Sequence, residues 1–144
     1  MTRSMRLITI LFVIALPILG ATQDRGPSGE WSLDTEGAEG DGWKLSPIHG
    51  TLSLEQNGDK ITGSWIGPFK ENAWKLEGAI KDASFEVRSD QRDIPVTRDG
   101  VTTMEPARWV FKGKASGDTM TGMMALDRGS SALREQAFSA TRTR

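Results

Sequence analysis

Tryptophan is the residue type in this chain best suited to binding a ligand. Neither tyrosine nor cysteine is present. Five tryptophans occur among the 144 residues. An indole ring combines a large apolar face with one N–H donor, which suits the lining of a small-ligand pocket. Methionine adds an adaptable apolar surface. We therefore take four side chains as candidate ligand-binding residues, namely Trp65, Trp74, Trp109 and Met124.

The same aromatic residues could instead fill the interior of a small protein. Several other apolar rings fall at positions expected to point inward: Trp31, Phe85, Phe111 and Phe138. Glycines at inward positions favour a cavity because they leave space unfilled; these are Gly63, Gly78, Gly113 and Gly122. The sequence leaves both a filled and a hollow interior open.

Acid–base and metal chemistry have little support. The one histidine, His49, lies in an expected loop, and neither a catalytic triad nor a zinc ligand set can be drawn around it. A nearby acidic loop lacks the spacing of a calcium-binding EF-hand; it holds Asp34, Glu36, Glu39 and Asp41. We therefore predict no metal, no cofactor and no enzymatic activity. The weaker hypothesis is a hydrolase that uses loop carboxylates such as Asp90, Asp93 or Asp99.

Residues 50–65 give the strongest structural signal. Leu52 and Leu54 alternate with polar residues, as in a strand with one buried face. Asn57-Gly58 can adopt the positive φ angles of a tight hairpin turn, and a second apolar segment follows it. Residues 58–63 are echoed by residues 117–122, which indicates a second hairpin built in the same way.

The chain as a whole predicts short strands and no stable helix. Eight strands are expected near Gly29, Thr51, Ile61, Ala73, Ser84, Arg108, Met120 and Gln136. Most of them are linked by tight turns, which favours an all-β, eight-stranded, antiparallel up-and-down barrel over residues 29–144. Residues 89–107 interrupt this rhythm and are longer than most loops, so they are either a lid or a solvated excursion.

The first 21 residues have the features of a secretory signal peptide. Arg3 and Arg6 precede an apolar segment, residues 7–19, that ends in small residues. This segment is short for a membrane span, although an uncleaved anchor is the alternative. No cysteine follows it for lipid attachment, and residues 22–28 form a flexible polar leader. We therefore expect a periplasmic or secreted protein without stable membrane insertion after cleavage.

The charge balance excludes some partners. Removal of residues 1–21 leaves 16 basic and 19 acidic residues, a net charge of −3. Binding to nucleic acid needs a concentrated basic face, which this balance disfavours. The absence of cysteine excludes disulfides and thiolate chemistry, so stability depends on the hydrophobic core.

The Gly29-x-Trp31 pair on the first expected strand, followed by serial hairpins, resembles the calycin group of lipocalins, fatty-acid-binding proteins and avidin-like proteins. The resemblance implies that Trp31 packs across the closed end of a barrel and that Arg142, near the last strand, lies over it. Residues 52–68 and 111–142 also resemble small exported bacterial β-domains, which mostly lack an assigned activity.

Two functional hypotheses follow. The first is a non-catalytic binding module for a small apolar ligand at the barrel mouth, gated by residues 89–107. The second is an interaction module with a filled core that binds another protein of the cell envelope.

Overall fold

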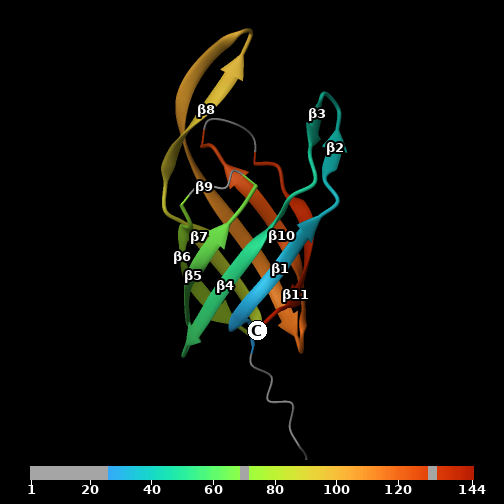
Figure 1. Cartoon of the computed structure of the whole chain (residues 1–144), viewed down its shortest axis with the longest axis vertical. Helices are drawn as coiled ribbons and strands as arrows, with labels where there is room; N and C mark the ends of the chain where they lie inside the picture. Colours follow the sequence, from blue (N-terminus) through green and yellow to red (C-terminus); the bar gives the residue numbers. More distant parts are fainter. Residues whose placement is uncertain (1–25, 69–71, 130–132) are drawn as a thin grey trace, which may run out of the picture.

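The structure is a computed structural model, and it describes residues 26–68, 72–129 and 133–144 (Figure 1). The predicted signal peptide, residues 1–21, lies outside the described residues, as does most of the leader. The described part of the chain contains eleven strands and no helix, so it holds no apolar helix of membrane-spanning length.

Eight strands form a closed antiparallel barrel, which confirms the predicted fold class. In chain order they are β1 (Gly29–Thr35), β4 (His49–Asn57), β5 (Lys60–Ile66), β6 (Trp74–Lys81), β7 (Ser84–Ser89), β9 (Val101–Ser116), β10 (Thr119–Asp127) and β11 (Gln136–Arg142). Each pairs with the next, and β11 pairs with β1 to close the barrel. Closure leaves no free edge among these eight strands.

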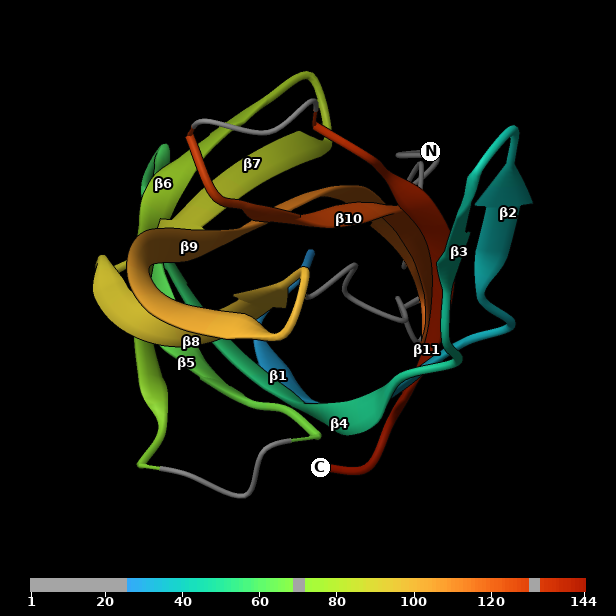
Figure 2. The same cartoon turned by 90° about the horizontal axis from the view of Figure 1, so that it is seen from above.

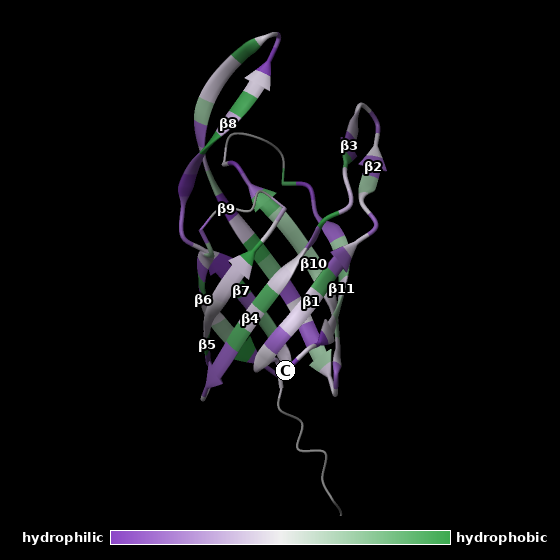
Figure 3. Ribbon diagram, viewed as in Figure 1, coloured by the Kyte–Doolittle hydropathy of each residue, from purple (hydrophilic) through white to green (hydrophobic). Residues whose placement is uncertain are grey.

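The pleat of each strand decides which side chains enter the core. Leu52 and Leu54 on β4 are buried, whereas the residues between and beyond them are more exposed. The same alternation appears as bands of hydropathy along the barrel strands in Figure 3. Because successive side chains point to opposite faces, a period-two sequence produces an apolar interior and a polar exterior.

Aromatic rings fill the middle of the barrel. The Phe111 ring lies 5.1 Å from the Trp65 ring and 6.2 Å from the Phe138 ring, both in edge-to-face geometry. Trp65 also meets Trp109 at 6.0 Å. Such pairs contribute about 0.5–1.5 kcal/mol each beyond the burial of their area. The aromatic residues therefore form much of the core that the sequence left open between a filled and a hollow interior.

The inward glycines do not leave space unfilled. A Cβ atom on Gly63 would lie 1.9 Å from the carbonyl oxygen of Ser53, and one on Gly78 would lie 1.8 Å from that of Glu86. Gly113 and Gly122 likewise face the backbone of a neighbouring strand. The inference of a cavity from these glycines is therefore wrong, because a neighbouring backbone already occupies the space.

One end of the barrel is sealed by Arg142. Its guanidinium lies 4.3 Å from the centre of the Trp31 ring and is almost fully buried. It donates hydrogen bonds to the carbonyl oxygens of Gly26, Ser28 and Gly117. Trp31 Nε1 donates to the carbonyl oxygen of Pro27 at 2.9 Å, and Pro27 is itself fully buried. We call this the closed end; residues 26–28 of the leader are packed into it.

Residues 89–107, expected to be a lid or a solvated excursion, are regular rather than irregular in backbone structure, which corrects the expectation of a loop. They contain β8 (Arg92–Arg98) and the first half of β9, which pair as an antiparallel ribbon. Asp99 and Gly100 both have positive φ, at 51° and 76°, as a two-residue hairpin turn requires. The two prolines are tolerated because each strand of the ribbon has only one neighbour here.

The acidic stretch predicted as a loop also contains a small hairpin. It consists of β2 (Ala38–Gly40) and β3 (Trp43–Leu45), which pair only with each other. The Arg134 guanidinium lies 5.0 Å from the centre of the Trp43 ring. Figure 2 shows this hairpin outside the ring of barrel strands, so it adds nothing to the core.

We expect Gly63→Ala to destabilise the barrel, because its Cβ would enter the backbone of β4. The loss should reach at least about 2 kcal/mol in urea unfolding followed by tryptophan fluorescence. Thr62→Ala on the same strand, at an exposed position, is the matched control. A midpoint for Gly63→Ala equal to that of the control would contradict the close approach.

We expect Arg142→Lys to destabilise the closed end by about 1–3 kcal/mol, although the charge is kept. A lysine cannot reproduce the planar donor fork that reaches three carbonyl oxygens. Thermal unfolding checks this, with Arg88→Lys in an exposed ion pair as the control. Equal melting temperatures for the two variants would show that Arg142 acts only as a charge.

Candidate functional site at the open end of the barrel

The end opposite Arg142 carries the longer connections, and we call it the open end. Strands β5 and β7 finish here, and β6 and β11 begin here. The β8–β9 ribbon rises from this end and curves over the ring of barrel strands (Figures 1 and 2). The ribbon carries Ile94, which packs against the core, and the buried Val96. A ligand that entered from this end would pass the ribbon.

All four candidate ligand-binding residues are buried near this end. The exposed fractions are 0% for Trp65, 3% for Trp74, 3% for Trp109 and 1% for Met124. The strand register sets Trp65 opposite Trp74, and Met124 opposite Phe111. The structure therefore brings the four residues into one apolar wall, with direct ring contact between Trp65 and Trp109.

Two glycines make room for the Trp65 ring. A Cβ on Gly50 would lie 2.4 Å from its Cη2 atom, and one on Gly67 would lie 2.7 Å from its Nε1 atom. The indole therefore occupies a space that exists only because positions 50 and 67 are glycine. Its N–H end lies beside Gly67, which is half-buried and follows the end of β5. The N–H group is thus close to the rim of the barrel.

The wall contains polar atoms without partners. Within the described residues, three buried side-chain atoms lack a hydrogen bond: Trp65 Nε1, Trp109 Nε1 and Gln136 Oε1. Gln136 begins β11 and stands opposite Met124 in the register. Each unsatisfied group costs about 1–3 kcal/mol, and buried groups of this kind call for a missing partner. Trp31 at the closed end, by contrast, is fully bonded.

The backbone around Trp109 is fixed even though its indole N–H is not. Its amide donates to Ser89 Oγ at 2.7 Å, and that hydroxyl donates to the carbonyl oxygen of Asp90 at 2.7 Å. Ser89 is only 5% exposed. These bonds tie the top of β7 to β9 and fix the backbone from which the Trp109 indole extends.

Trp74 has its own cover from the ribbon. The Arg92 guanidinium lies 4.4 Å from the centre of its ring and donates to the carbonyl oxygens of Asn72 and Ala73 at 2.8 and 2.7 Å. Arg92 Nε donates to Asp90 Oδ2 at 2.9 Å. These bonds fix the base of the ribbon to the barrel. They do not involve the indole N–H groups of Trp65 and Trp109.

Sequence reasoning missed three members of this region, Gln136, Arg92 and Gly67. Gln136 could have been found, because it shares its strand parity with the inward Phe138. Arg92 was hidden inside a segment expected to be irregular. The role of Gly67 depends on where the Trp65 ring turns, which the pattern of the chain does not specify.

The candidate acid–base residue His49 lies at the surface beside one carboxylate. His49 Nδ1 and Asp34 Oδ1 lie 2.6 Å apart, a contact that sequence reasoning missed, but both side chains are more than half exposed. The described ranges contain no group of three or more His, Asp or Glu side chains placed to hold a metal ion.

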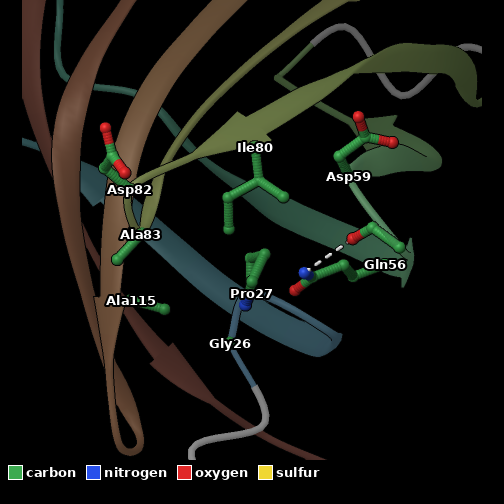
Figure 4. Close-up of a pocket in the computed structure, with 9 residues that line it drawn as sticks. Gly26, Pro27, Gln56, Asp59, Ile80, Asp82, Ala83 and Ala115 are labelled. Carbon is green, nitrogen blue, oxygen red and sulfur yellow. Dashed lines mark hydrogen bonds between the residues drawn. The ribbon is translucent and has the colours of Figure 1, made fainter.

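A hollow lies at the closed end and is drawn in Figure 4. Its volume is about 440 Å³, and Pro27, Ile80 and Ala115 supply apolar surface. Asp59 and Asp82 at its rim are exposed, and Gln56 Nε2 donates to the carbonyl oxygen of Gly58 at 2.9 Å. The three unpartnered buried atoms of the described chain all lie elsewhere.

Comparison of the chain with protein-family models, curated proteins and solved structures finds no significant match. The fold alone thus defines the class, an eight-stranded antiparallel barrel closed by its first and last strands.

We expect Arg92→Ala to raise the quenching of tryptophan fluorescence by acrylamide, because it uncovers the Trp74 ring. Arg88→Ala on the neighbouring strand, in an exposed ion pair, should leave quenching unchanged. The increase should vanish in a Trp74→Phe background. An increase that survives in that background would mean that Arg92 stabilises the open end as a whole.

Proposed function

We propose that this protein is a non-catalytic, calycin-like binding module that holds a small, mostly apolar ligand at the open end of its barrel. Trp65, Trp109 and Met124 form the apolar wall that the ligand touches. Trp74, under Arg92, anchors the base of the β8–β9 ribbon beside it.

One observation carries this proposal: among the described residues, two indole N–H groups and one amide oxygen near the open end are buried without partners. A core built only for stability would bond these groups or replace them with phenylalanine and leucine, because each unpaired group is costly. A binding site accepts that cost in the empty state, since the ligand supplies the partner.

The ribbon supports the same proposal. It curves over the ring of strands, and its inward-facing Ile94 packs against the core. Motion of the ribbon beyond the base that Arg92 fixes would admit a ligand without opening the barrel itself. The basic and apolar character of residues 1–21 adds the expectation of a periplasmic or secreted location.

The second candidate function is an interaction module that binds another envelope protein. The observation that favours it is on the ribbon, where Val101 and Met104, on opposite faces of β9, are 63% and 61% exposed. Strand β8 is also an edge strand, and unpaired strand edges attract partner chains. Purification from envelope extract with no co-purifying protein would count against this alternative.

Binding of N-phenyl-1-naphthylamine, an uncharged apolar probe, tests the first proposal. We expect its fluorescence to rise on mixing with the purified chain from residue 22 and tryptophan emission to fall. Met124→Ala should weaken binding, and Met123→Ala, the exposed neighbour on the same strand, should not. No change in either signal would overturn the proposal. Native mass spectrometry of protein from its own envelope fraction would add the mass of any natural cargo.

A further inference from the structure

We infer that the ligand carries an uncharged oxygen acceptor, such as a ketone, ester, amide or alcohol oxygen, which receives the indole N–H bonds of Trp65 and Trp109. This inference rests on the proposed binding function and specifies the chemistry of the polar end of the ligand.

The argument begins with the kind of groups that lack partners. An indole nitrogen donates only, so the complement of two indole groups is an acceptor. A carbonyl oxygen has two lone pairs and can receive two donors at once. The Trp65 and Trp109 rings are in direct contact, with centroids 6.0 Å apart. Because these rings pack edge to face, a ligand head held at the margin of the pair lies close to both indoles, and a carbonyl oxygen there can serve both N–H groups.

The side-chain amide of Gln136 increases the number of polar groups that a ligand could present to this site. Its Oε1 atom is buried and unpartnered. Rotation of the amide by half a turn exchanges its oxygen and nitrogen at nearly the same positions. The side chain can thus accept from an alcohol or donate to a second oxygen, as in an ester. Both kinds of head remain neutral.

The charge of the surroundings excludes an ionised head. Among the described residues, the buried polar side chains are Thr35, Ser89 and Gln136, and none of them carries a charge. Arg92, the cation over the Trp74 ring, already bonds Asp90 and two carbonyl oxygens. A carboxylate held against the indoles would be buried without a counter-ion, which is strongly unfavourable. Fatty acids in their ionised form therefore fit this site poorly.

The space around Trp65 indicates where the head enters. Gly67 lies beside the Trp65 indole N–H, and it has no side chain that would block access to this group. Gly67 is itself half-buried. A small shift of this segment exposes the N–H at the rim. The polar end of the ligand is then held just inside the barrel, and its apolar remainder extends beneath the ribbon.

Competition against bound N-phenyl-1-naphthylamine separates the possibilities. The competitors are 2-octanone, 2-methyl-1-octene (the same skeleton with CH₂ in place of oxygen) and octanoate. We expect 2-octanone to compete best. Trp65→Phe and Trp109→Phe keep an aromatic ring but remove one donor each. Each should weaken 2-octanone by about two- to tenfold, the value of one neutral hydrogen bond, and leave 2-methyl-1-octene unchanged. Trp43→Phe, outside the barrel, is the control.

A second readout on the unmodified protein covers the case in which a variant fails to fold. In ¹H–¹⁵N spectra, 2-octanone should move two indole N–H signals downfield, and neither should be the signal that Trp43→Phe removes. Equal competition by the ketone and the alkene, or tighter binding of octanoate, would overturn this inference. Equal competition by the ketone and the alkene would indicate that bound water satisfies the indole N–H groups. Failure of the probe itself to bind would instead overturn the proposed function.

Discussion

The close approach of neighbouring backbones at the inward glycines is the constraint on which the rest of this barrel depends. At Gly63 and Gly78, the carbonyl oxygen of the next strand occupies the volume that a side chain would need. Strands can then coil tightly enough for the last of eight to pair with the first. A small closed barrel has a narrow interior, and a few aromatic rings are enough to fill it. The rings at Phe111, Phe138 and Trp65 therefore meet edge to face across the core.

This packing gives the two ends different characters. At the closed end, Arg142 lies over the Trp31 ring and donates hydrogen bonds to carbonyl oxygens of residues 26–28 and of the β9–β10 turn. At the open end, the described residues provide no hydrogen-bond partner of that kind for the indoles of Trp65 and Trp109. Since both ends bury tryptophan equally well, hydrophobicity does not account for the difference. Hydrogen bonding does, and it is the reason to look for a partner at the open end.

The sequence was most informative where structure is local. The period of two in residues 50–65 and the Asn57-Gly58 turn predicted a hairpin, and the structure places one there. The eight strands followed from repetition of that pattern. The Asp99-Gly100 turn carries a similar local signal, but prolines and charges in residues 89–107 masked it. Those features are compatible with a ribbon whose strands have one neighbour each, and the number of neighbours is a tertiary property that no local pattern encodes.

The candidate site shows the same boundary between local and tertiary information. That Trp65, Trp74, Trp109 and Met124 face one interior follows from strand parity, and the structure buries all four. Which indole finds a partner does not follow from parity, since it depends on carbonyl groups brought from distant segments. Trp31 is bonded because the chain at Pro27 crosses beneath it. Among residues 26–68, 72–129 and 133–144, no comparable bond reaches Trp65, whose N–H lies beside the backbone of Gly67. A glycine at that rim keeps the donor unpaired and near the surface, and a donor in that position can bind a ligand at the cost of little rearrangement.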